Sequence, residues 1–106
     1  MTVYVALRVY LRPGEEKNFE QTYHEVSSKL RGNIPGQLSD ELLRPVTKEE
    51  PYILLSQWES VDAHQAWTAT GQHRDDVMPL RQHWTHTNSQ EYLLVATTET
   101  NQEGGS

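Results

Sequence analysis

The stretch from residue 52 to residue 67, YILLSQWESVDAHQAW, constrains the fold more than any other part of the chain. Its first seven residues alternate with the two-residue period of a β-strand, and Trp58 ends one face of that strand. Ser60 has the side chain of a helix N-cap, and an apolar stripe then reaches Trp67 about two turns later. The pattern predicts a strand followed at once by a helix, with both tryptophans facing one space.

Further elements are predicted on either side of this block. They are a strand over residues 2–12, a helix over 15–31, a strand over 37–45, a short helix that Thr70 caps and that reaches Met78 before Pro79, and a strand over 90–98. Residues 80–89 are polar and, apart from Trp84, irregular, which predicts a loop. The order of strands and helices is that of an α+β, ferredoxin-like sandwich, with a four-stranded antiparallel sheet and helices on one face.

The first predicted strand is largely apolar on both of its faces. Val3, Val5 and Leu7 alternate along it with Tyr4 and Ala6. An antiparallel sheet with one face in water normally alternates apolar with polar residues. Because the predicted helices cover one face only, we expect a second copy of the chain to cover the other, sheet against sheet. The sequence therefore predicts a homodimer.

Charge and composition exclude several classes of function. The 106 residues include 9 Lys and Arg and 15 Asp and Glu, so the net charge of −6 disfavours general binding to nucleic acid or anionic lipid. The absence of cysteine excludes disulfides, thiolate metal sites and a thiol nucleophile. Arg8 and Arg12 interrupt the apolar N-terminal run, so we expect no signal peptide, no membrane span and a cytoplasmic location. We predict one domain over residues 1–98 and a flexible tail over 99–106.

Several blocks of the sequence are shared with a known family. They are Pro35-Gly36-x-Leu38, Leu42-Leu43-Arg44-Pro45, residues 52–58 with Glu59-Ser60 after them, and then Ala63 and Trp67. In these blocks and in the order of its elements, the chain resembles the antibiotic biosynthesis monooxygenase (ABM) domain superfamily. The resemblance implies a dimeric α+β barrel, in which eight strands from two subunits close together and each subunit has one pocket between sheet and helices.

The resemblance also implies particular activities and site residues. Some members are cofactor-independent oxygenases that turn polyaromatic phenols into quinones, others degrade haem, and still others have no assigned activity. The quinone-forming members have a tryptophan that Trp58 matches, whereas Leu54 and His64 stand where asparagine and tyrosine occur in some of them. The haem-degrading members have a tryptophan that Trp67 matches, whereas Leu7 stands at their asparagine position. Their histidine, nine or ten residues after that tryptophan, has no counterpart in this chain.

Histidine and tryptophan side chains suit the chemistry of oxygenation without a cofactor. A deprotonated phenol passes an electron to oxygen directly, so the protein supplies a base, a donor for the anion and a dry aromatic pocket. Histidine is the natural base because it titrates near neutral pH. We therefore predict that His64, His73 and Trp58 are the catalytic residues. The predicted substrate-binding residues are Trp67, Leu54, Leu7, Tyr23 and Trp84.

Other interpretations of these residues stay open from the sequence alone. Trp58 and Trp67 also suit ordinary core packing, and His64 suits the surface of its helix. Four of the five histidines lie between residues 64 and 86, but acidic residues are not tightly interleaved with them, so we expect no metal site. Glycine-rich nucleotide-binding motifs and the GxSxG motif are absent from the sequence.

Residue chemistry and resemblance together predict a small monooxygenase that needs no cofactor. It would use molecular oxygen to convert an aromatic, phenolic or polyketide-type substrate into a quinone or a hydroxylated product. The alternative is a protein of the same fold that takes haem as its cofactor and binds or degrades it. A third reading is a dimer that binds a small ligand without catalysis or uses its pocket for non-oxidative proton chemistry.

Overall fold

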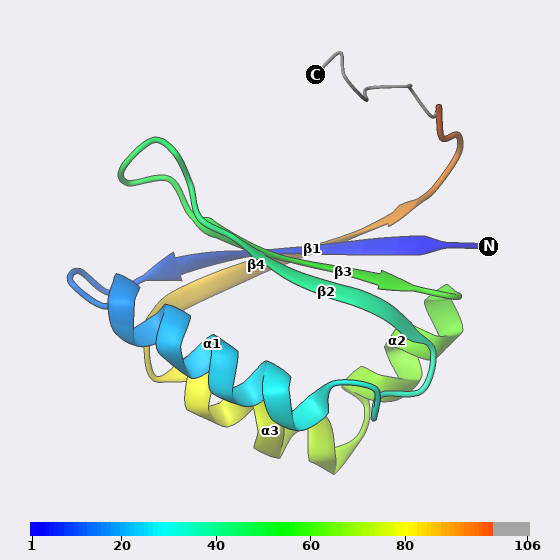
Figure 1. Cartoon of the computed structure of the whole chain (residues 1–106), viewed down its shortest axis with the longest axis horizontal. Coiled ribbons are helices and arrows are strands. Elements are labelled where there is room, and N and C mark those ends of the chain that lie inside the picture. The colour runs from blue at the N-terminus through cyan, green and yellow to red at the C-terminus, as the bar shows by residue number, and fades with distance from the viewer. Residues whose placement is uncertain (99–106) are drawn as a thin grey trace, which may run out of the picture.

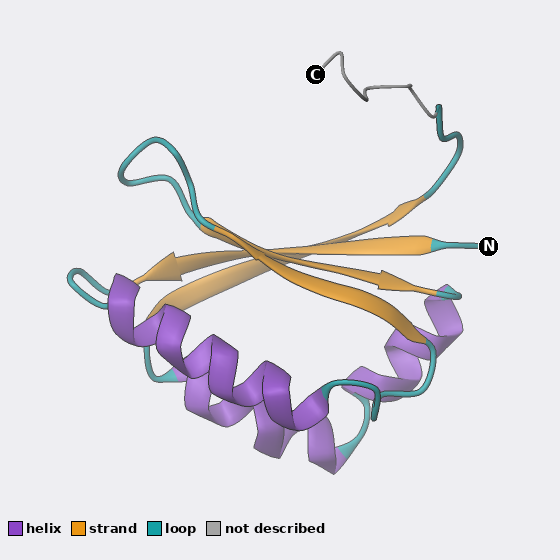
Figure 2. Ribbon diagram, in the orientation of Figure 1, coloured by secondary structure: helices purple, strands orange, loops and turns teal. Residues whose placement is uncertain are grey.

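The computed structural model describes residues 1–98 and contains a four-stranded antiparallel sheet with three helices on one side (Figures 1 and 2). The strands are β1 (Val3–Leu11), β2 (Gln37–Leu43), β3 (Tyr52–Trp58) and β4 (Trp84–Leu93), and the helices are α1 (Glu16–Leu30), α2 (Val61–Thr68) and α3 (Gly71–Arg81). The strand order across the sheet is β2-β3-β1-β4. This arrangement confirms the predicted ferredoxin-like fold. The tail predicted over residues 99–106 lies outside the described residues.

The strand register decides which side chains face the helices. Val3 of β1 lies opposite Trp58 of β3, and Leu7 lies opposite Leu54. Because side chains alternate along a strand, these residues share the inner face of the sheet, which the helices cover. The opposite, outer face carries the residues between them, among them Tyr4.

The buried side chains between sheet and helices form two clusters rather than one. One cluster contains Val3, Val5, Ile34, Trp58 and Trp67. The other contains Val9, Phe19, Tyr52 and Leu80. Leu7 and Leu54 lie on the inner face between the two groups and are only half-buried. The interior is therefore packed at its two ends and open in the middle.

A side-chain cap fixes where α2 begins. The hydroxyl of Ser60 accepts a hydrogen bond from the backbone N–H of Ala63 at 3.0 Å, as predicted for the N-cap of α2. Gly36, just before β2, has φ of +83°, and a Cβ added to it would lie 2.5 Å from the Cβ of Ala63. Only glycine fits this turn without strain, so Gly36 lets α2 approach the start of β2 closely.

The last strand differs from its prediction. β4 begins at Trp84 and ends at Leu93, so the segment predicted as a loop over 80–89 is largely strand, and only residues 90–93 of the predicted strand belong to it. Its inner positions include Thr87, Ser89 and Glu91, opposite Val9, Leu7 and Val5 of β1. Polar residues therefore occupy both faces of β4, and apolar alternation, the usual sign of a strand, is missing there.

The helix after Thr70 is longer than predicted. α3 runs through Pro79 to Arg81 instead of ending near Met78. Proline removes the backbone donor that would bond the carbonyl four residues earlier, which is Asp75. Asp75 is exposed, so water can satisfy its carbonyl and the helix continues. None of the described helices combines the length and apolar character needed to cross a bilayer.

Candidate functional site

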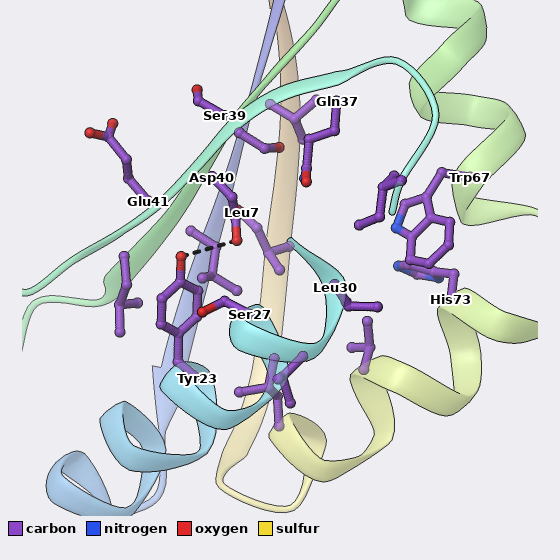
Figure 3. Close-up of a pocket in the computed structure, with 18 of the residues that line it drawn as sticks. Leu7, Tyr23, Ser27, Leu30, Gln37, Ser39, Asp40, Glu41, Trp67 and His73 are labelled. Atoms are coloured by element: carbon purple, nitrogen blue, oxygen red, sulfur yellow. Dashed lines mark hydrogen bonds between the residues drawn. The ribbon is translucent and has the colours of Figure 1, made fainter. Parts of the chain in front are cut away.

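A cavity of about 1160 Å³ fills the open middle of the domain, between the inner face of the sheet and the helices (Figure 3). Every residue predicted for the site lies on its wall: His64, His73, Trp58, Trp67, Leu54, Leu7, Tyr23 and Trp84. Residues that are far apart in sequence therefore meet at one hollow. Its size and mostly apolar lining suit a small organic ligand.

His64 projects from α2 against the end of β3. The centres of its ring and the Trp58 ring are 5.1 Å apart, and its Nδ1 lies 2.8 Å from Oε2 of Glu91 on β4. Glu91 was not among the predicted site residues. Trp58 is almost fully buried, and its Nε1–H donates to the hydroxyl of Ser56 at 2.8 Å. A carboxylate bonded to Nδ1 favours the tautomer in which Nε2 is free to accept a proton.

His73 lies one helix further along and packs against the second tryptophan. Its ring meets Trp67 edge-on with ring centres 5.4 Å apart, and its backbone N–H donates to the hydroxyl of Thr70, which caps α3. Burial is the main reason that its pKa is lowered from the ordinary value of 6.5, and the positive charge of Arg81 adds to the effect. His73 is therefore neutral at pH 7 and able to accept a proton.

The middle of the cavity floor, away from the two histidines, is apolar. Leu7 and Leu54 lie directly opposite each other on neighbouring strands, and both line the cavity. Leu54 stands at the asparagine position of some quinone-forming family members, and Leu7 stands at the asparagine position of the haem-degrading members. The structure therefore brings both departures together into one apolar patch of the floor.

A polar pair lies across the cavity from the histidines. The hydroxyl of Tyr23 on α1 donates to Oδ2 of Asp40 on β2 at 3.0 Å, as Figure 3 shows. Burial raises the pKa of Asp40, and the nearby charge of Glu41 adds to the rise. Burial and then Asp40 raise the pKa of Tyr23 well above its usual 10, so Tyr23 stays protonated and remains a donor. Tyr23 was predicted for the site, whereas Asp40 was not.

A second polar group joins α1 to the strands at one end of the cavity. Arg44 donates two hydrogen bonds to Glu20, at 2.6 and 2.7 Å, and the hydroxyl of Tyr52 donates to the same carboxylate at 2.5 Å. These donors lower the pKa of Glu20 to about 2. Since Glu20 and Arg44 satisfy each other, the group forms a closed contact between elements.

A further histidine is buried away from the cavity wall. His83 contacts Oε1 of Glu15 through Nδ1 at 2.7 Å and the hydroxyl of Thr22 through Nε2 at 3.0 Å. Both ring nitrogens are thus satisfied, and the side chain joins α1 to the turn before β4. Within residues 1–98, no group of three His, Asp or Glu side chains is arranged to hold a metal ion.

Comparison with known proteins identifies the family. Residues 2–77 match the family model described as antibiotic biosynthesis monooxygenase, and this match spans most of the chain. The protein therefore belongs to the antibiotic biosynthesis monooxygenase family. This finding agrees with the resemblance seen in the sequence.

Two curated relatives match different shares of this chain. The chain is 26% identical over 102 residues to protein SchA of Streptomyces halstedii, covering 96% of this chain and 27% of SchA. It is 46% identical over 55 residues to a mycobilin-producing haem oxygenase of Mycobacterium tuberculosis, covering 52% of this chain and 48% of that protein. The chain thus spans about a quarter of the length of SchA and about half of the haem oxygenase.

Solved structures of a cofactor-independent oxygenase and of a haem degrader share the fold of this chain. SnoaB from Streptomyces nogalater, a cofactor-independent oxygenase, superposes with a TM-score of 0.75 at 21% identity, covering 91% of this chain and 95% of SnoaB. The haem degrader MhuD from M. tuberculosis, with two haems in its active site, superposes with a TM-score of 0.73 at 25% identity, covering 92% of this chain and 99% of MhuD. At 21% identity, the likeness to SnoaB shows only that the two proteins share a fold.

Proposed function

We propose that this protein is a cofactor-independent monooxygenase that oxidises an aromatic phenol to a quinone with molecular oxygen. The observation that carries the proposal is the pairing of two cavity-lining imidazoles, His64 and His73, each with the ring of a tryptophan. The family to which the chain belongs supports the general reaction class.

The proposed reaction begins with proton transfer to a neutral imidazole. With an anthrone as substrate, a base removes a proton, and the resulting electron-rich anion passes an electron to oxygen. The substrate radical and superoxide then combine to form a carbon–oxygen bond. After protonation, this hydroperoxide loses water and leaves the quinone. One anthrone and one O₂ thus give one anthraquinone and one water: the CH₂ carbon is oxidised, and O₂ is reduced.

The cavity residues have separate roles in this scheme. His73 is the base, because its lowered pKa keeps it unprotonated. His64, backed by Glu91, is the second proton acceptor or donor. Trp58 and Trp67 are buried at the cavity wall, where their rings pack against His64 and His73 and hold the two imidazoles in position. Leu7 and Leu54 form an apolar patch in the middle of the floor, which strengthens electrostatic interactions with the anion elsewhere in the cavity.

Substitution of each histidine tests this assignment. We expect His73→Asn to lower kcat for anthrone oxidation by about 100-fold, within the range for loss of a general base, and His64→Asn to lower it by less. Oxygen uptake is measured with an electrode in metal-chelated buffer. Gln72→Asn and Gln65→Asn are matched controls, because both glutamines are exposed neighbours on the same helices. Unchanged kcat in both histidine variants would overturn the proposed roles.

Haem binding is the second candidate function, because one cavity residue fits that group. A neutral His73 is a suitable nitrogen ligand for iron, whereas Leu7 offers no polar group. Bound haem would supply iron for oxygen activation. The 46% identity to the mycobilin-producing haem oxygenase over 55 residues also favours this candidate. Hemin titration distinguishes the two: a tight complex whose Soret shift disappears in His73→Ala supports haem, and no shift rejects it.

A further inference from the structure

One transverse row of the sheet carries polar side chains at both edges of the inner face. Asp40 of β2 lies opposite Ser56 of β3, Ser56 lies opposite Val5 of β1, and Val5 lies opposite Glu91 of β4. The strands are about 4.8 Å apart, so the backbones of β2 and β4 are separated by roughly 14 Å. Two carboxylates therefore belong to the same row, at opposite edges of the inner face of the sheet.

Each carboxylate of this row has one aromatic partner from a helix. Glu91 contacts His64 at 2.8 Å, and Asp40 accepts from the hydroxyl of Tyr23 at 3.0 Å. Glu91 is not on the cavity wall, although its partner His64 is, whereas Asp40 lines the wall itself. The two ends thus differ: one presents an imidazole and the other presents a carboxylate with a phenol beside it.

Asp40 retains capacity for a ligand. The Asp40 side chain is accessible to solvent, yet the protein groups around its carboxylate raise its pKa. Both properties are expected of a side chain that faces into a cavity, and Asp40 lines the cavity wall. Within the described residues, its hydrogen bond to Tyr23 engages Oδ2 alone. Arg44, a cation that also lines the cavity, donates both of its hydrogen bonds to Glu20.

We infer that Asp40 and Tyr23 form a second polar subsite, which binds a hydroxyl group of the substrate at the end opposite to the histidines. Asp40 accepts a hydrogen bond from that hydroxyl, and Tyr23 holds the carboxylate in place. The pair is a specificity determinant, because it selects substrates with hydroxyl groups at both ends of a fused aromatic system. This inference rests on the proposed function for its substrate class, although binding alone can test it.

A matched pair of unreactive ligands tests the subsite. 2,6-Dihydroxyanthraquinone has a hydroxyl at each end, and 2-hydroxyanthraquinone has one at a single end. Dissociation constants are measured by quenching of tryptophan fluorescence, since Trp58 and Trp67 line the cavity. We expect the wild-type protein to bind the dihydroxy compound about tenfold more tightly, the range for one hydrogen bond to a charged group.

Variants assign this preference to the carboxylate. Asp40→Asn is expected to reduce the preference to about threefold or less, because a neutral amide is a weaker acceptor. Tyr23→Phe is expected to reduce the preference by a smaller factor than Asp40→Asn does, because the carboxylate remains but loses the hydroxyl that holds it in place. The control is Asp75→Asn, which removes the same charge from an exposed position on α3 that is not on the cavity wall. Thermal melting of each variant reports whether it is folded.

The outcomes separate this inference from the proposed function. Equal wild-type affinities for the two ligands, binding of neither, or an undiminished preference in Asp40→Asn would each overturn the subsite. Oxygen uptake with anthrone and with a panel of polycyclic phenols is measured in parallel. Turnover without ligand preference rejects the subsite alone, whereas preference without turnover rejects the oxygenase and retains the subsite.

Discussion

At the scale of single residues, the microenvironment of His73 makes a prediction about pH. Its pKa lies below 6.5, chiefly because it is buried and then because of Arg81 and His64, while Asp76 acts in the opposite direction. The base is active when neutral, so kcat/KM for anthrone should rise with pH and level off below the pH expected for an ordinary histidine. Stopped assays across the acid range measure this limb.

Two charge variants test the sign of this effect. Asp76→Asn removes a group that favours the imidazolium, so the acid limb should move to lower pH. Arg81→Gln removes a group that disfavours it, so the limb should move to higher pH. Shifts in the reverse directions, or no movement in either variant, would show that another group controls the limb.

The sequence predicted which residues line the cavity better than it predicted their partners. Strand period and family resemblance brought Trp58 and Trp67 to one space, as the structure finds. Glu91 and Asp40 were missed because their pairing with His64 and Tyr23 depends on strand register, which joins residues far apart in the chain. A polar residue at an inward position of a predicted strand is the signal that was available for Asp40.

At the scale of secondary-structure elements, the turn before β2 predicts an unequal effect of two glycine substitutions. Gly14 and Gly36 both have positive φ, but an added Cβ meets nothing within 4 Å at Gly14 and lies 2.5 Å from the Ala63 Cβ at Gly36. Gly14→Ala should cost about 1 kcal/mol of unfolding free energy, and Gly36→Ala about 3 kcal/mol, because only the latter adds a steric clash. Urea denaturation measures both values.

A double variant isolates the contact with α2. Ala63→Gly in the Gly36→Ala background should recover the part of the loss that exceeds the cost of Gly14→Ala, apart from the cost of a new helical glycine. Equal destabilisation by the two single substitutions would contradict the close approach of α2 to this turn.

Elements were predictable where hydrophobic period was strong. β3 was predicted over its observed bounds, and α1 to within one residue at each end. The predicted start of β4 was too far along the chain because the inward positions of this strand are polar. A cavity beside the strand allows polar residues there. Backbone pairing with β1, rather than an apolar pattern, holds this segment in the sheet. The predicted α3 was too short because Pro79 was expected to end the helix. Pro79 instead lies near the exposed C-terminal end of the helix, where the helix continues to Arg81.

At the scale of the whole molecule, the outer face of the sheet supports a homodimer as a proposal. Its residues include Ala6, Ile53 and Leu55, beside the stacked rings of Tyr10 and His86. Light scattering should give twice the subunit mass of 12.2 kDa. A charge at the centre of this face, Leu55→Glu, should yield monomers by desolvation and repulsion. A wild-type mass of 12.2 kDa at micromolar concentration would contradict the proposal.

The most direct test of the central claim is the oxidation of anthrone by the wild-type protein, free of metal and haem, under isotopically labelled oxygen gas. The proposal predicts that one O₂ is consumed for each anthraquinone formed, and that one labelled atom appears in the new carbonyl and the other in water. Mass spectrometry of the quinone measures the label. Absence of enzyme-dependent oxygen uptake with anthrone and with a panel of polycyclic phenols, or turnover that requires added hemin, would contradict it.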